Sequence, residues 1–363
     1  MQILLPFIYL GFALVVIIII FYSERKLAAF IQDRLGPTEV GFVGTLQPIA
    51  DLMKMIQKED IIPTGSSSFL FRAAPLFIFL VVFAGFAFIP LAPGLIPVNS
   101  HIGVFFCLTI ISLDVVGLLM AGWSAENKFA LLGAMRSVSQ IISYEIPIGI
   151  TVLSAIVLSG SMDLTKIALN QSLWSETQSW FLGIKQLGWE TTRIGGFLNW
   201  NLFQSPFMFI SYIIFYIATL AECNRAPFDL PEAESELVAG YHSEYSGIRF
   251  GIFFLAEYAM MVLVSLLGAF LFLGAWATPF PNIGSFRLGD WTSGTYGEWT
   301  CIAWSIFWLV IKTLVPCIAM IWIRWTFPRL RTDQLMYFCW KVLIPFSLAG
   351  FILVCLGKYL SLA

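Results

Sequence analysis

The chain has 363 residues, of which 59% are hydrophobic, 16% aromatic and 12% charged, and its formal net charge is −2. With a mean hydropathy of +0.85, this composition excludes an ordinary soluble domain and indicates a membrane protein. The nearly neutral balance gives no sign of nucleic-acid binding. Six scattered cysteines without a Cys-x-x-Cys pair, and two distant histidines, suggest neither disulfides, cluster ligands nor a metal site.

Eight apolar runs are long enough to cross a bilayer, which takes about 20 residues. They are Ile3–Tyr22, Ala73–Pro90, Ile102–Trp123, Val138–Gly160, Leu202–Ala221, Phe250–Trp276, Thr300–Ile323 and Leu335–Leu356. The sequence therefore predicts an all-α polytopic membrane helix bundle, with a single membrane domain over residues 1–363. The first run has no charged leader or cleavage pattern, which favours a retained helix over a signal peptide.

The link between the first two runs contains a short amphipathic pattern. Leu46, Ile49, Met53 and Ile56 share one helical face, and polar residues occupy another. Because the segment is too short and polar to span, we expect an interfacial helix.

The orientation follows from the lysines and arginines. Thirteen fall in the odd-numbered links, and five fall in the even-numbered links or after the last run. The positive-inside rule then places the odd-numbered links in the cytoplasm, or its topological equivalent, and both termini on the outer side. The long outer segment 161–201 carries four tryptophans suited to interfacial anchoring, and its role stays open.

An acidic loop, residues 222–249, joins the fifth and sixth runs on the predicted cytoplasmic side. It holds six carboxylates: Glu222, Asp229, Glu232, Glu234, Glu236 and Glu244. Carboxylates crowded in a poorly solvated place cannot all ionise, so some should accept protons near neutral pH. A solvated and inert hydrophilic loop is the alternative.

Ionisable residues also lie inside the apolar runs, at Asp114, Glu145, Glu257, Lys312 and Lys341. Charges in lipid are costly, which predicts a polar bundle interior. Glu145 and Glu257 lie at a similar depth, about 10 Å from the cytoplasmic ends of their runs. Depth thus permits a row of carboxylates that includes Glu222, although each could instead pair locally to fix packing. Pro147 frees a carbonyl beside Glu145, where water could relay protons.

Two basic segments lie near the membrane surface, Glu24 to Pro37 and Arg324 to Gln334. Ordinary positive-inside charge explains both. The basic residues in these segments alternate with acids, prolines and aromatics, which also suits a binding site for a polar head group or a partner protein.

These stretches resemble the H-subunit family of the proton-pumping NADH:quinone oxidoreductase, respiratory complex I. The matching motifs are Glu24-Arg-Lys with Gln-x-Arg-x-Gly-Pro, Leu46-Gln-Pro-x-Ala-Asp-x-x-Lys54, Ser143-Tyr-Glu-x-Pro147, Ala221-Glu-x-Asn-Arg-Ala-Pro-Phe-Asp-Leu-Pro-Glu and Trp322-x-Arg-x-x-x-Pro-Arg-x-Arg-x-Asp-Gln-Leu335. The resemblance covers nearly the whole chain.

The resemblance implies a quinone chamber where this protein meets the hydrophilic arm of the complex. The residues carried over to quinone binding are Arg25, Arg34, Asp51, Lys54, Arg225, Asp229, Arg324 and Arg329. Those carried over to proton coupling are Glu145, Glu222, Glu232, Glu234, Glu244 and Glu257. Lys312 and Lys341 also belong to the expected pattern.

The chain carries no nucleotide fingerprint and no cysteine ligand set, so it cannot be active alone. The resemblance implies that iron-sulfur clusters, FMN and NADH sit on partner subunits, with quinone as substrate and lipid around the bundle. The expected location is a bacterial inner membrane, or else an organellar energy-converting one. Two alternatives stay open: the equivalent subunit of a membrane-bound hydrogenase or a ferredoxin- or F420H2-linked complex, and an independent proton or ion transporter.

Overall fold

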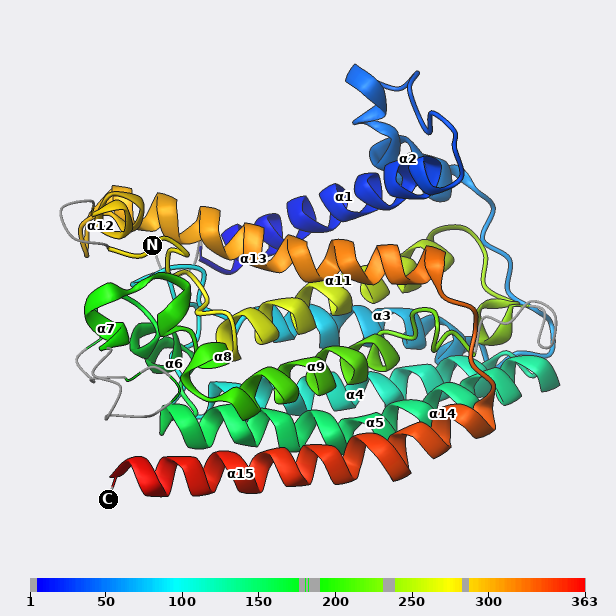
Figure 1. Cartoon of the computed structure of the whole chain (residues 1–363). Coiled ribbons are helices and arrows are strands. Elements are labelled where there is room, and N and C mark those ends of the chain that lie inside the picture. The colour runs from blue at the N-terminus through cyan, green and yellow to red at the C-terminus, as the bar shows by residue number, and fades with distance from the viewer. Residues whose placement is uncertain are drawn as a thin grey trace.

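The computed structural model describes residues 5–175, 180, 182, 190–230, 239–282 and 287–362 (Figure 1). In this part of the chain, seven helices are long and apolar enough to cross a membrane. They are α1 (Leu5–Ile31), α3 (Ser68–Phe86), α4 (Gly103–Ser124), α5 (Lys128–Ser159), α11 (Gly247–Leu271), α13 (Trp299–Thr326) and the run Thr332–Leu360. A shorter apolar helix, α9 (Pro206–Glu222), completes the set. Each predicted span thus corresponds to a helix, and the all-α membrane bundle is confirmed.

The last span is built from three consecutive pieces. These are α14 (Thr332–Phe338), a π-helical turn (Cys339–Leu343) and α15 (Ile344–Leu362). The short elements are α2 (Gln47–Gln57), α6 (Leu164–Asn170), α7 (Thr191–Ile194), α8 (Asn201–Gln204), α12 (Leu288–Ser293) and the 3-10 turns Phe42–Gly44, Gly196–Asn199 and Gly240–His242.

The two ends of the bundle differ. One end, on the left of Figure 1, carries α6, α7, α8, α12 and both termini. The opposite end carries α2 and the loop that joins α13 to α14. Both termini therefore share one end, as an even number of spans requires. Which end faces the cytoplasm stays a prediction.

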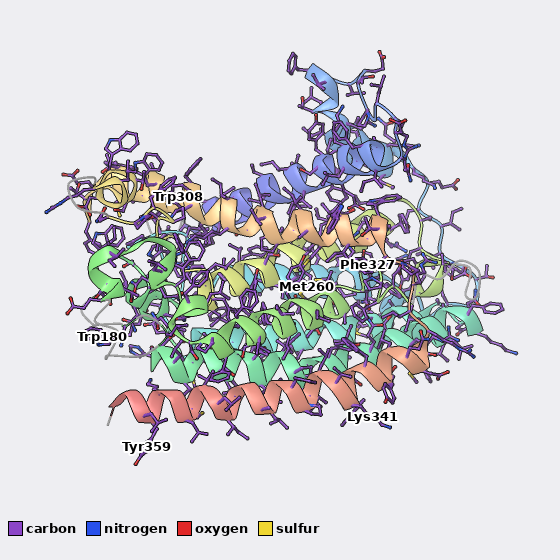
Figure 2. The ribbon with its side chains drawn as sticks, viewed as in Figure 1. Trp180, Met260, Trp308, Phe327, Lys341 and Tyr359 are labelled. Carbon is purple, nitrogen blue, oxygen red and sulfur yellow. The ribbon has the colours of Figure 1, made fainter. Side chains whose placement is uncertain are left out.

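Helix α11 forms the centre of the bundle. It packs mainly on α3, α13 and α1, and every residue from Tyr258 to Leu271 is buried. Met260 lies in the middle of the molecule (Figure 2). Glu257, one residue before this buried stretch, therefore faces protein rather than lipid.

Helix α5 brings two other helices together. Its first turn is capped by Asn127, whose side-chain oxygen accepts from the backbone N–H of Phe129 at 3.0 Å. It ends at Gly160, whose left-handed backbone (φ 72°) suits glycine. Between these ends α5 packs on α4 and α9. Three helices that carry Asp114, Glu145 and Glu222 are thus neighbours.

Helix α1 continues to Ile31, well beyond Tyr22 where its apolar run ends. The membrane-facing sequence stops before the helix does, so Glu24 and Arg25 are helical. The expected amphipathic helix is present as α2, and its apolar residues Ile49, Met53 and Ile56 are exposed. Its position at a membrane interface stays a prediction.

The two lysines within the spans differ in their surroundings. Lys312 is buried, donates to the carbonyl of Ala277 at 2.6 Å and lies 4.2 Å from the ring centroid of Trp200. Lys341 is instead exposed on the surface of the bundle (Figure 2), and its ammonium group lies 4.7 Å from the ring centroid of Tyr337. A long side chain close to a helix end can reach the polar interface in this way, so Lys341 needs no polar interior.

Candidate functional site

Glu24 lies at the centre of a charged cluster, formed with Arg225, Tyr258 and Arg324, at the end of the bundle near α2. Its carboxylate is buried and accepts hydrogen bonds from the hydroxyl of Tyr258 and from Nη1 of Arg324. Nη1 of Arg225 lies 3.5 Å from the same carboxylate. The cluster joins α1, α11, α13 and the loop after α9, which are remote in sequence.

Arg225 is the most enclosed cation of this cluster. Its guanidinium lies 4.2 Å from the ring centroid of Tyr258, and its side chain is only 7% exposed. Among the described residues, its Nε and Nη2 atoms have no hydrogen-bond partner. A buried cation needs a nearby counter-charge, and Glu24 supplies it.

A second ion pair joins α1 to α2. Nη2 of Arg25 lies 2.6 Å from Oδ2 of Asp51, and the side-chain amide of Gln47 donates to Oδ1 of Asp51 at 3.1 Å. Arg34 and Lys54 are exposed, and within the described part of the chain they form no ion pair. Of the four expected quinone-binding residues near α2, Arg25 and Asp51 thus form an ion pair, and Arg34 and Lys54 form none among the described residues.

A third ion pair ties the acidic loop to the loop after α13. Nη2 of Arg329 donates to Oδ2 of Asp229 at 3.1 Å. Burial raises the pKa of Asp229, and the positive charges of Arg329 and Arg324 oppose that rise. The eight residues expected at the quinone site therefore lie at one end of the bundle, and six of them are held in ion pairs with one another or with Glu24.

The second part of the site is a small internal cavity. Asp114 of α4, Glu222 of α9 and Glu257 of α11 all line it, and its volume is about 20 Å³. Asp114 Oδ1 and Glu222 Oε2 have no hydrogen-bond partner among the described residues. A cavity of this size can hold one water molecule when polar atoms surround it. The geometry thus suits a water-bridged carboxylate cluster.

Glu257 faces both the cavity and the one-turn helix Gly240–His242. Its Oε1 accepts from the hydroxyl of Tyr241 at 2.9 Å and lies 3.2 Å from Nε2 of His242. The end of the acidic loop therefore touches the carboxylate cluster through Tyr241 and His242.

Glu145 lies beside this cluster on α5. It does not line the cavity, but α5 packs on both α4 and α9, which carry Asp114 and Glu222. The neighbouring Pro147 leaves the carbonyl of Ser143 without its helical donor, and the thiol of Cys339 donates to that carbonyl at 3.1 Å. The carbonyl expected to admit water is therefore occupied by a side chain.

The remaining acidic-loop residues lie elsewhere or outside the described residues. Glu244 accepts from the side-chain amide of Asn127 at 2.7 Å, at the start of α5. It is thus fixed at the end of the bundle and does not line the cavity. Glu232 and Glu234 belong to the part of the chain that is not described.

Sequence reasoning missed two members of the site. Glu24 looked like interfacial charge, because the apolar run ends before it. The sequence places Asp114 deeper in the same row of buried carboxylates, but Asp114 is not among the residues expected to couple protons. The position of Glu24 depends on where α1 ends, and that of Asp114 depends on helical phase, which depth along a helix does not reveal. Among the described residues, no three histidine, cysteine, aspartate or glutamate side chains are grouped to hold a metal ion.

Fold and site together define a polytopic membrane protein with a charged cluster at one end and carboxylates in its interior. The sequence model of the NADH dehydrogenase family matches residues 4–355. The second H subunit of the NADH-quinone oxidoreductase of Cytophaga hutchinsonii is 54% identical over 335 residues, which cover 91% of this chain and 92% of that protein. The H subunits of the enzymes of Chlorobaculum tepidum and Anaeromyxobacter dehalogenans are 47% and 40% identical, over 92% and 93% of this chain and 85% and 77% of their own lengths.

The chain belongs to this family, as the membrane-embedded H subunit of an NADH-quinone oxidoreductase. It is therefore part of an oxidoreductase complex, and the other components of that complex are its partners.

Proposed function

We propose that this protein forms the membrane wall of a quinone chamber and couples quinone reduction to proton translocation. The observation that carries the proposal is the convergence of Asp114, Glu222 and Glu257, from three different helices, on one small cavity. Carboxylates that only fix packing would pair locally, whereas Asp114 Oδ1 and Glu222 Oε2 have no hydrogen-bond partner among the described residues. Glu145 and the loop residues Glu232, Glu234 and Glu244 would extend the same row.

The charged cluster around Glu24 supports the chamber. Arg225, Arg324 and Arg329 supply cations for the polar quinone head, and Asp229 supplies a carboxylate beside them. Arg25, Arg34, Asp51 and Lys54 would line the mouth. The exposed apolar residues of α2 offer a surface for the quinone tail.

The chemistry of quinone reduction explains why a quinone chamber would be coupled to carboxylates in the interior of the bundle. Quinone becomes quinol by gaining two electrons and two protons, so negative charge that arrives in the chamber must be met by protonation. Two unit charges about 10 Å apart interact by roughly 1.7 kcal/mol at an effective dielectric of about 20. That energy exceeds one pKa unit. A row of coupled carboxylates can therefore transmit the change in charge from the quinone chamber into the bundle.

The electrons would come from partner subunits, because the sequence contains no nucleotide fingerprint and no clustered cysteines. We place NADH, FMN and the iron-sulfur clusters there. The relatives named above are bacterial, which supports a bacterial inner membrane.

The direct test is Glu222→Gln in the assembled complex, with quinone reductase rate and proton pumping both measured. The amide keeps the shape of the side chain but cannot carry the proton. We expect both activities to fall at least tenfold with assembly intact, and the same for Glu232→Gln or Glu234→Gln. Glu39→Gln, an exposed carboxylate at the same end, is the control. Unchanged coupling in Glu222→Gln would contradict the proposal.

The electron donor separates the closest alternatives. A membrane-bound hydrogenase or a ferredoxin- or F420H2-linked complex would share the carboxylate cavity but would not oxidise NADH. Purified complex should reduce quinone with NADH and not with those donors. If the chain alone moved protons across liposomes, it would be an independent transporter.

A further inference from the structure

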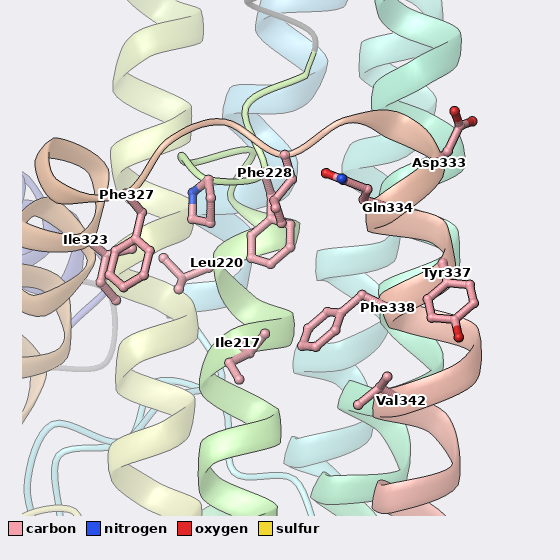
Figure 3. Close-up of a pocket in the computed structure, with 12 residues that line it drawn as sticks. Ile217, Leu220, Phe228, Ile323, Phe327, Asp333, Gln334, Tyr337, Phe338 and Val342 are labelled. Carbon is pink, nitrogen blue, oxygen red and sulfur yellow. The ribbon is translucent and has the colours of Figure 1, made fainter.

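An apolar groove lies between α9, α13 and α14, beneath the loop that joins α13 to α14 (Figure 3). Its volume is about 840 Å³, and Asp333 is the one charged residue in its lining. The side chain of Asp333 is 82% exposed. The groove therefore offers apolar contact but little chemistry that would select an occupant. A more specific arrangement lies at the end of the acidic loop.

Residues 241–249, which we call the strap, lead from the acidic loop into α11. At the first end of the strap, the hydroxyl of Tyr241 donates to Oε1 of Glu257 at 2.9 Å, and Nε2 of His242 lies 3.2 Å from the same atom. Tyr241 and His242 are both buried. The strap therefore holds the carboxylate of Glu257, which lines the internal cavity.

The second end of the strap holds the linker that follows α2 (residues 58–67). Oγ of Ser246 accepts from the backbone N–H of Ile61 at 3.1 Å and donates to the carbonyl of Glu59 at 3.3 Å. Nη2 of Arg249 lies 2.8 Å from Oδ2 of Asp60. Three consecutive linker residues are thus bound to the strap, on both sides of the ion pair.

The middle of the strap is also fixed. The ring of Tyr245 stacks on that of Phe71 in α3, with centroids 4.1 Å apart and an interplanar angle of 3°. The hydroxyl groups of Tyr245 and of Ser124 in α4 lie 3.1 Å apart. The guanidinium of Arg249 lies 5.5 Å from the centroid of the Phe71 ring. A segment this short, held along its length, has little slack between its two ends.

Arg249 depends on its ion pair with Asp60. Its side chain is only 15% exposed, and its Nη1 has no hydrogen-bond partner among the described residues. A largely enclosed cation needs its counter-charge. Loss of either charge should therefore release this end of the strap.

We propose that Arg249 is a positioning residue for Glu257. With Asp60 it fixes the strap, and the strap fixes Tyr241 and His242 on the carboxylate of Glu257. The inference rests on the proposed function, in which Glu257 takes part in proton coupling. Because the linker continues α2, a displacement of α2 at the quinone mouth would reach the cavity through this contact.

The first test is hydrogen–deuterium exchange of the assembled complex, read by mass spectrometry. The backbone N–H groups of His242 and Ser243 donate within the turn at the first end of the strap, at 3.2 and 3.3 Å. We expect Arg249→Gln to speed exchange at these amides at least about fivefold, because the turn opens more often once the other end is released. Asp60→Asn removes the same pair from the linker side and should have the same effect. Unchanged exchange in either variant would overturn the proposal.

Two further variants serve as controls for this experiment. Arg249→Lys keeps the charge and should exchange like the wild type. Arg287→Gln removes an exposed pair with Asp290 at the opposite end of the bundle, and it should leave the strap unchanged. Exchange that rises equally in Arg287→Gln would show a general loss of stability and would overturn the proposal.

The second test observes Glu257 itself, which a merely structural role of Arg249 would not affect. Redox-difference infrared spectroscopy of the complex should contain a carboxyl band that is lost in Glu257→Gln. We expect this band to shift in Arg249→Gln, because the hydrogen bonds to Glu257 change, and to keep its wild-type position in Arg249→Lys. A wild-type position in Arg249→Gln, or the absence of any band that depends on Glu257, would overturn the proposal.

Glu222→Gln separates the failure of this inference from the failure of the proposed function. If Glu222→Gln loses proton pumping while Arg249→Gln keeps wild-type exchange and a wild-type Glu257 band, only the positioning role is wrong. If Glu222→Gln keeps full coupling while Arg249→Gln shows both effects, the proposed function is wrong and the positioning of Glu257 stands.

Discussion

Nη1 of Arg225 lies 3.5 Å from Oε1 of Glu24, in a place where both side chains are almost fully enclosed. This ion pair connects the first membrane helix to the start of the acidic loop. Arg225 belongs to the charged cluster near α2 and follows Glu222, which lines the cavity, by three residues.

Glu24→Gln should destabilise the protein by about 3–5 kcal/mol, because it leaves the buried Arg225 cation without its counter-charge. The measurement is the thermal unfolding midpoint of the purified complex. Glu39→Gln removes an exposed carboxylate from the same end of the bundle and should change that midpoint little. Equal midpoints in the two variants would show that Glu24 does not hold the cluster together.

The linker after α2 is fastened to the start of α11. Gly247 has a positive φ of 58°, and a Cβ there would lie 3.1 Å from the carbonyl oxygen of Lys58. Nη2 of Arg249 also contacts Oδ2 of Asp60 at 2.8 Å. The linker and the end of the acidic loop are thus in direct contact.

Gly247→Ala should cost about 1–2 kcal/mol from the left-handed backbone alone and should push the linker away. Trypsin should then cut faster after Lys58. Gly251→Ala is the matched control, because its nearest neighbours, atoms of Met55, would lie at an ordinary 3.6 Å. Identical cleavage rates in both variants would mean that the linker is not fastened there.

The pair between Asp229 and Arg329 predicts a dependence on pH. Burial raises the pKa of Asp229, and Arg329 opposes that rise. Folding raises the pKa of this carboxyl group above its ordinary value near 3.8. The folded protein therefore becomes less stable as the pH increases from 3.8 through the raised pKa. Without Arg329 the pKa should rise further and the loss should deepen.

We therefore expect Arg329→Gln to match the wild type at low pH and to become less stable as pH rises. The difference should reach at most about 1 kcal/mol, because Arg329 is half exposed. Unfolding midpoints measured between about pH 4 and pH 8 test this. In an Asp229→Asn background the difference should disappear, and a difference that is constant with pH would refute the assignment.

The sequence predicted most of the fold because lipid imposes long apolar runs, and all eight are helices. The amphipathic α2 was likewise readable from its period. The ends of helices were not, because α1 remains helical through the polar residues after Tyr22. For that reason the sequence predicts Glu24 in a surface link, whereas the structure places it on α1.

The sequence predicts how deep each carboxylate of the candidate site lies along its helix, but not in which direction its side chain points. Glu244 belongs to the acidic loop and Glu257 follows the loop on α11, and of these two residues only Glu257 reaches the cavity. The difference arises from helical phase and from the turn Gly240–His242, which places Tyr241 and His242 against Glu257. Asp114 joins them because α4 packs on α5 and α3, a tertiary contact that the sequence pattern does not encode.

The central claim is that quinone reduction changes the protonation of the interior carboxylates. Redox-difference infrared spectroscopy of the assembled complex observes the carboxyl C=O stretch directly. We predict a band that appears on quinone reduction, shifts in D2O, and is lost in both Asp114→Asn and Glu222→Gln but kept in Glu39→Gln. A spectrum in which that band persists unchanged in both cavity variants would contradict the claim.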